Sequence, residues 1–215
     1  MPLSDLATLE GKKLMPRTEG ARFIVFDSLD GSGQSTQIKL LEQYLKGKGY
    51  EVLVTKEPSF GSVAGDKIRE VLAHKAEMDP KELQNLFVED RREHIEKVII
   101  PALKEGKVVI SDRYFFSTFA FGAKDADLEW LIELNKDFIM PDITFILKVR
   151  PEICVERIQK RGAGGQLFEK TEILKRVWAV YEKMPERFKG VHIIDGEMPI
   201  GAVSQDVAVL VDKIL

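Results

Sequence analysis

A run of four apolar residues, Phe23–Phe26, leads directly into a turn rich in Gly, Ser and Asp over residues 27–33, and a helical pattern follows. A buried strand, a glycine loop and a helix N-terminus together form a phosphate site, because backbone N–H groups and the helix dipole point at the anion. Ser35 or Thr36 would then offer a hydroxyl to Mg²⁺. The stretch 23–37 therefore predicts a phosphate-binding loop, with an ordinary helix cap as the alternative.

The loop departs at two positions from the common phosphate-binding pattern G-x-x-x-x-G-K-[ST]. Gly33 and Ser35 are in register with the pattern, but Ser28 stands at its first glycine and Gln34 stands at its lysine. Glutamine donates hydrogen bonds but carries no charge, so it positions a phosphate without neutralising it.

Short apolar strands alternate with amphipathic helices along the rest of the chain. This alternation predicts an α/β fold, in which helices cover both faces of a parallel sheet and ligands lie beyond the carboxyl ends of the strands. Strands are predicted at 23–26, 52–55, 108–110, 143–147 and 191–194. Helices are predicted at about 35–48, around 68–72, from Pro80 to Ile99 with Pro101 at the end, twice after Pro151, and at about 200–214.

The composition limits the class of protein. A length of 215 residues indicates one domain, taken here as 21–215 behind an N-terminal extension of residues 1–20. The net charge of −3 argues against a general nucleic-acid binder. No apolar run approaches the ~20 residues of a membrane span and no signal-peptide pattern opens the chain, so we expect a cytoplasmic protein without a membrane partner.

The cysteine and histidines carry no sign of metal or thiol chemistry. Cys154 lies in an apolar helical pattern, so it is expected to be buried and unreactive. His74, His94 and His192 lack metal-ligand spacing and are expected at surface or edge positions.

Asp112-Arg113-Tyr114 follows the third predicted strand, and with the loop it resembles the thymidylate kinase family of nucleoside monophosphate kinases. The resemblance covers about residues 22–212 and implies a P-loop kinase fold with a five-stranded parallel sheet, a small lid at about 162–170 and a homodimer. It also implies transfer of phosphate from ATP to dTMP with Mg²⁺, giving dTDP and ADP. The motifs that carry it, in the family's order, are 30–37, Glu57-Pro58, 68–70, 86–91, 112–121, 156–162 and Phe168-Glu169.

On the acceptor side, the resemblance implies that Phe87 stacks on the thymine, although its helical spacing also fits core packing. Arg91 would hydrogen-bond the base, with a solvated ion pair as the alternative. Arg113 and Arg69 would clamp the monophosphate, because a planar fork of donors suits phosphate oxygens. The remaining residues implied around the substrate are Glu57, Pro58, Ser117 and Phe121.

On the donor side, Asp112 would hold Mg²⁺ together with Ser35, with a structural Asp–Arg pair as the alternative. Asp30 would orient the acceptor, although a turn-capping role also explains it. Arg161 would lie against the adenine of ATP. The loop residues implied to hold ATP are Gly31, Ser32, Gly33, Gln34, Ser35 and Thr36.

The chain lacks the positive charges that this family normally places at the transferred phosphate. Gln34 replaces the loop lysine, Gly31 stands where some members carry Arg, and Gln166-Leu167 stands where the lid usually carries an acidic residue and Arg. Loss of one such contact commonly costs on the order of 10²–10³ in rate. The loop after Glu57-Pro58 also departs, with Ser59-Phe60 in place of two glycines, which leaves room for broader monophosphate specificity.

Two hypotheses account for these departures. The first is an active but altered kinase in which Mg²⁺, Arg113 and a lid cation, such as Lys160, Arg161 or Lys170, replace the missing charge. The second is a catalytically weakened or inactive nucleotide-binding paralogue. The retained acceptor-side residues favour the active kinase.

Overall fold

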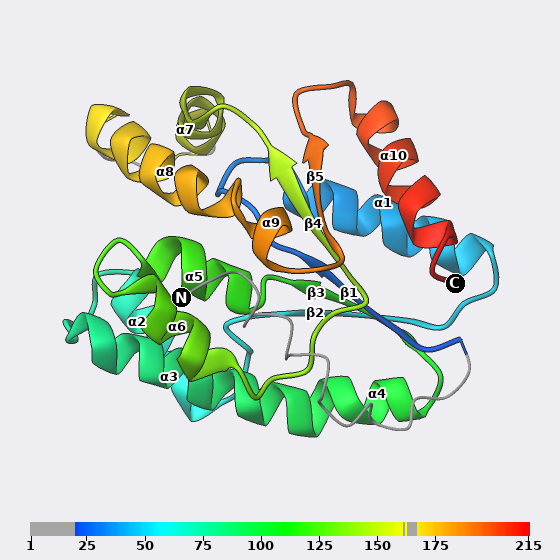
Figure 1. The fold of residues 1–215 in the computed structure, drawn as a ribbon, viewed down its shortest axis with the longest axis horizontal. Helices are drawn as coiled ribbons and strands as arrows, with labels where there is room; N and C mark the ends of the chain where they lie inside the picture. The colour runs from blue at the N-terminus through cyan, green and yellow to red at the C-terminus, as the bar shows by residue number, and fades with distance from the viewer. Residues whose placement is uncertain (1–19, 161, 163–166) are drawn as a thin grey trace.

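The computed structural model describes residues 20–160, 162 and 167–215 (Figure 1). Residues 1–19 of the predicted extension and residues 163–166 of the predicted lid lie outside this part of the chain. The described residues form one sheet of five parallel strands in the order β2-β3-β1-β4-β5. Its strands are β1 (Arg22–Phe26), β2 (Val52–Lys56), β3 (Val108–Asp112), β4 (Ile143–Lys148) and β5 (Val191–Asp195).

All five predicted strands are present, each within one or two residues of its predicted bounds. The central strands β1, β3 and β4 are almost completely buried, as their largely apolar sequences require. The prediction of a parallel α/β sheet is therefore confirmed.

Helices cover both faces of the sheet (Figure 1). One face packs against α1 (Gln34–Gly47) and α10 (Ile200–Asp212), which lie side by side. The other face buries a larger cluster rich in aromatic residues. The helices that contribute to that cluster are α3 (Pro80–His94), α4 (Ile100–Lys104), α5 (Phe115–Gly122), α6 (Leu128–Asn135), α7 (Pro151–Lys160), α8 (Leu167–Tyr181) and α9 (Met184–Arg187), while α2 (Val63–Leu72) packs on α3.

The long helix predicted from Pro80 to Ile99 is present but is not uniform. It runs as α3, passes through the π-helical turn η2 (Ile95–Ile99) and continues as α4 to Lys104. Pro101 lies at the start of α4. Proline removes a backbone donor and crowds the preceding turn, and the wider π turn just before it gives the chain room to continue as a helix.

The sheet register brings the ends of three strands together. Asp112 at the end of β3 is the register partner of Phe26 in β1 and of Lys56 in β2. The chain leaving β1 becomes the glycine loop, and the N-terminus of α1 follows it. The loop, Asp112 and Lys56 therefore meet at the carboxyl edge of the sheet, where ligands of such sheets lie.

In the part of the chain that the structure describes, no helix combines the length and the apolar character that crossing a membrane requires.

Candidate active site

The glycine loop borders a polar pocket of about 220 Å³. Gly33 is the N-cap of α1 with φ of 96°, and no side chain caps the helix there. The first N–H groups of α1 are consequently available to an anion. The pocket is lined by Leu29, Asp30, Gly31, Ser32, Gly33, Gln34, Ser35, Thr36, Lys56, Asp112 and Arg113.

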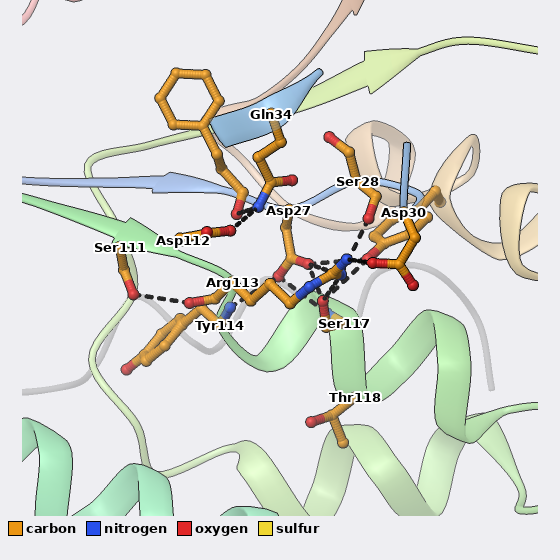
Figure 2. Close-up of polar contacts among 12 residues, drawn as sticks. Asp27, Ser28, Asp30, Gln34, Ser111, Asp112, Arg113, Tyr114, Ser117 and Thr118 are labelled. Carbon is orange, nitrogen blue, oxygen red and sulfur yellow. Dashed lines mark hydrogen bonds and ion pairs between the residues drawn. The ribbon is translucent and has the colours of Figure 1, made fainter. Parts of the chain in front are cut away.

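Gln34, at the usual lysine position, is buried and fixed by two acceptors. Its Nε2 donates to the carbonyl of Phe26 at 3.1 Å and to Oδ1 of Asp112 (Figure 2). Because both partners only accept, the orientation of the amide is determined, and its buried Oε1 has no hydrogen-bond partner among the described residues. The side chain therefore joins the loop to β3 but brings no charge to the pocket.

The other departures in the loop have packing reasons. The Ser28 hydroxyl accepts a hydrogen bond at 2.8 Å from the backbone N–H of Leu147 in β4, which a glycine would leave unpaired. A Cβ atom at Gly31, whose φ is 83°, would lie 2.4 Å from the carbonyl oxygen of Cys154 in α7. Gly31 therefore cannot be replaced by an arginine unless α7 moves. Cys154 itself is buried, as predicted.

The pocket residues fit a magnesium ion. Mg²⁺ prefers oxygen ligands, and in phosphoryl-transfer sites one or two carboxylates hold it together with substrate phosphates. Asp112 offers a carboxylate, and Ser35 and Thr36 stand on the same pocket wall. The buried Ser32 hydroxyl in that wall has no hydrogen-bond partner in the part of the chain that the structure describes. Among the described residues, no group of three or more His, Cys, Asp and Glu side chains is arranged to hold a metal without substrate oxygens.

Arg113 is held in one orientation at the pocket edge (Figure 2). Its backbone has φ of 79°, and its Nη1 donates to the carbonyl of Ser28 at 3.0 Å and to Ser117 Oγ at 2.8 Å. Its Nη2 donates to Asp30 at 2.7 Å, and its guanidinium lies 5.3 Å from the ring centroid of Phe121. The structure thus brings together four predicted site residues: Asp30, Arg113, Ser117 and Phe121.

Asp27, which was not predicted as a site residue, contacts Arg113 and Ser117 from the interior of the protein. It is fully buried, and its carboxylate accepts from the backbone N–H groups of Tyr114 and Ser117 at 3.1 and 2.9 Å. The hydroxyls of Ser117 and Tyr181 also donate to it, and Arg113 Nη1 lies 4.0 Å away. Burial raises the pKa of the Asp27 carboxyl to about 6, against the opposing effect of Arg113. Its position directly after β1 was the available sequence signal.

Arg91 lies inside the protein rather than on a solvated surface. Its side chain is 1% exposed and its Nε donates to Glu57 at 2.8 Å, while its other nitrogens donate to Asn135 and Thr118. The alternative of a solvated ion pair is therefore wrong. These internal partners take three of the five N–H donors of the guanidinium, and a direct hydrogen bond from Arg91 to a base stays a prediction.

His94 corrects another expectation. It was expected at a surface or edge, but it is buried, with Nδ1 3.2 Å from Glu57 and Nε2 2.6 Å from the Thr55 hydroxyl. Glu57 is thus the centre of a buried polar network that joins β2 to α3.

The loop after Glu57-Pro58 is tied to α2 and α3. Arg69 in α2 donates to the carbonyls of Pro58 and Ser59 at 3.2 and 2.5 Å, and it lies 4.5 Å from the ring centroid of Phe60. The backbone N–H of Ser59 donates to the buried Asp90 at 2.8 Å, and the Ser59 hydroxyl also donates to that carboxylate. Serine in place of glycine therefore anchors this loop. The described contacts of Arg69 and Arg113 do not join the two side chains, so a shared phosphate clamp stays a prediction.

The described part of the chain places two of the three predicted compensating cations. Lys160 is exposed and pairs with Glu156 at 2.6 Å, Lys170 lies within α8, and Arg161 falls outside the described residues. The positive side chain that the sequence interpretation missed is Lys56, which lines the pocket and lies 3.1 Å from Asp112. Its place at the end of β2 was the available signal.

Phe87 is half-buried on α3, and neither hydrophobic cluster of the described residues includes its ring. The ring therefore does not pack in those clusters, and its stacking on a base stays a prediction.

A sequence model of the thymidylate kinase family matches residues 26–207. A probable thymidylate kinase from Pyrococcus horikoshii is 38% identical over 195 residues, covering 88% of this chain and 95% of the relative. A thymidylate kinase from Desulfotalea psychrophila is 36% identical over 196 residues, covering 90% and 96% of the two chains. One from Caldicellulosiruptor saccharolyticus is 37% identical over 201 residues, covering 90% and 97%. This agreement over nearly the whole chain, on a parallel sheet with a glycine loop at its carboxyl edge, shows that the protein belongs to the thymidylate kinase family.

Proposed function

We propose that this protein is an ATP-dependent thymidylate kinase, which transfers the γ-phosphoryl group of ATP to dTMP to give dTDP and ADP. The observation that carries the proposal is a single pocket lined both by the glycine loop and by Asp112-Arg113, in a chain of this family. The loop supplies a phosphate cradle, and the pair after β3 supplies a carboxylate and a fixed guanidinium.

The donor nucleotide is proposed to bind with its phosphates against the loop N–H groups and the N-terminus of α1. Ser35 and Asp112 would hold Mg²⁺, which when bound neutralises charge on the phosphates. Gln34 keeps Asp112 in place through its amide. Arg161 remains the proposed neighbour of the adenine. The proposed ATP-binding residues are those of the pocket wall: Gly31, Ser32, Gly33, Gln34, Ser35 and Thr36.

The acceptor is proposed to bind on the side of Arg113, Ser117 and Phe121, whose contacts already form one group. Arg113 and Arg69 would bind its phosphate, and Phe87 would stack on the base. Arg91, with Glu57 and Pro58, is proposed to form the base-side wall, since its network joins the loop after β2 to α5.

In the transfer itself, an oxygen of the dTMP phosphate forms a bond to the γ-phosphorus while the bond to the β–γ bridging oxygen breaks. The released electron pair leaves on ADP. The protein's part is positioning and charge stabilisation rather than covalent chemistry. Arg113 and Asp30 would align the acceptor.

The proposal is tested by ADP formation in a coupled assay with ATP, Mg²⁺ and each nucleoside monophosphate in turn. We expect turnover with dTMP above the ATP-only control, and turnover with further monophosphates if the altered Ser59-Phe60 loop broadens specificity. An Arg113→Ala variant should lose most of this turnover, while Lys46→Ala, at an exposed ion pair with Glu42 in α1, should retain it. Background ADP formation with every monophosphate would contradict the proposal and favour a nucleotide-binding paralogue.

We also propose a homodimer and a cytoplasmic location. Support for self-association comes from large apolar side chains exposed on and beside α2: Phe60 is 76%, Val63 is 72% and Leu72 is 55% exposed. Light scattering that gives a monomer mass at micromolar concentration would contradict the dimer. The charged composition and single buried cysteine are consistent with a reducing, aqueous compartment.

A further inference from the structure

The phosphate pocket has a positive side chain that comes from neither the glycine loop nor the lid. Lys56 is the last residue of β2, and the register between β2 and β3 places it directly beside Asp112. Its Nζ lies 3.1 Å from Asp112 Oδ2, and its side chain is 46% exposed. The lysine thus stands at the open side of the pocket on a rigid strand end.

Neither Gln34 nor Arg113 supplies a positive charge to the donor side of the pocket. Gln34 donates its amide to Asp112 and Phe26 and carries no charge. Arg113 lines the same pocket, but its guanidinium donates to Ser28, Ser117 and Asp30, which fixes it on the acceptor side. Phosphoryl transfer needs positive charge where negative charge spreads over the transferred group.

Lys56 and Gln34 bind the two oxygens of the same carboxylate. Gln34 holds Oδ1 of Asp112 and Lys56 lies beside Oδ2, so amide, carboxylate and ammonium form one chain across the pocket. A lysine ammonium on a flexible four-carbon stem rotates readily from one oxygen to another. Because the side chain is half exposed, phosphate oxygens in the pocket are accessible to it without any change in the sheet.

We propose that Lys56 supplies to the ATP phosphates the positive charge that Gln34 does not, so that the cation of the donor site comes from β2 instead of the loop. This inference rests on the proposed kinase function and names the residue that allows it without the usual loop lysine. It predicts that the side chains at positions 34 and 56 substitute for one another.

The test is a double-mutant cycle with Lys56→Ala, Gln34→Lys and the combination, measured by ADP formation with dTMP. Lys56→Ala should lower kcat by about 10²-fold, on the scale seen for loss of one charge-stabilising contact, while the KM for dTMP stays within about threefold. In the Gln34→Lys background the same change should cost less than about tenfold. Lys56→Arg should retain activity and Lys56→Gln should not, because the charge rather than the length is required.

The matched control is Lys48→Ala. Lys48 is 42% exposed and pairs with Asp212 at 2.7 Å, so it resembles Lys56 in exposure and ion pairing. It lies at the far end of α1, about 20 Å from the loop at 1.5 Å per helical residue. Activity within twofold of the wild type is expected, and circular dichroism and Tm confirm folding of every variant.

Two results would overturn the inference while leaving the kinase proposal intact. One is a loss of less than tenfold in Lys56→Ala when the wild type is active. The other is an equal loss with Gln and with Lys at position 34, since that would show an ion pair acting independently of the missing charge. If the wild type turns over no monophosphate, the kinase proposal fails, and calorimetric binding of a non-hydrolysable ATP analogue decides the inference: tenfold weaker binding by Lys56→Ala supports it, and unchanged binding overturns it.

Discussion

Arg91 and Glu57 form an ion pair inside the protein, with 2.8 Å between Nε and Oε2 and only 1% and 4% of the two side chains exposed. The pair joins the end of β2 to α3, and Thr118, Asn135 and His94 complete its hydrogen bonds. A charge pair so deeply buried depends on having both members, because either one alone is an uncompensated charge.

We therefore expect Glu57→Ala to destabilise the protein by about 3–5 kcal/mol, since Arg91 would be left buried without its carboxylate. At roughly 2–4 °C per kcal/mol for a domain of this size, Tm should fall by at least about 6 °C. Glu156→Ala, which breaks an exposed pair with Lys160, is the control and should cost less than about 1 kcal/mol. Equal Tm values for the two variants would show that the buried pair stabilises the protein no more than the exposed pair does.

Asp27 makes stability depend on pH. Burial raises the pKa of its carboxyl from 3.8 to about 6, so the folded protein binds a proton between these values that the unfolded chain has released. Below pH 4 both states are protonated, and above pH 6 both are ionised and the folded state carries the cost of a buried charge. Relative to Asp27→Asn, the wild type should therefore lose on the order of 3 kcal/mol of unfolding free energy as pH rises from 4 to 7.

Urea unfolding of the wild type and Asp27→Asn at several pH values measures this difference directly. Subtracting the variant removes the contribution of other carboxylates that titrate in both proteins. Parallel stability curves between pH 4 and 7 would contradict the raised pKa of Asp27.

The glycine loop contains a matched pair of substitutions. Gly31 and Gly33 both have positive φ, of 83° and 96°, which penalises any side chain. A Cβ at Gly31 would also lie 2.4 Å from the Cys154 carbonyl oxygen, whereas no atom of the described residues lies within 4 Å of one at Gly33. Gly31→Ala should therefore destabilise the protein by about 1–3 kcal/mol more than Gly33→Ala, as overpacking typically does. Equal losses by urea unfolding would mean that α7 moves aside without cost.

The sheet was predictable because its strands are short apolar runs that end at polar residues. Such runs are typical of strands that are buried on both faces of a parallel sheet. Helix α5 was not predicted, although its residues were recognised as a motif. Phe115, Phe116 and Phe119 are all buried, so the helix is apolar on nearly every side and lacks the amphipathic period that identifies a surface helix.

The buried network around Glu57 could not be predicted from the sequence, for a different reason. Its carboxylate meets Arg91 and His94, which lie 34 and 37 residues along the chain, and the contacts exist only once β2 packs against α3. Lys56 and Asp27 could have been predicted as site residues from the sequence, because each directly follows a predicted strand. Lys56 reaches the pocket from β2, whose register with β3 places it beside Asp112, rather than from the glycine loop or the lid.

Thymidylate kinase activity is measured without a coupling enzyme by following labelled phosphate from [γ-³²P]ATP to dTMP with the unmodified protein, the nucleotides being separated by chromatography. We expect the label to appear in dTDP, in proportion to the ADP formed, and we expect Arg113→Ala to abolish most of this transfer. Label that remains in ATP, or that is released as inorganic phosphate without forming dTDP, would contradict the proposed activity.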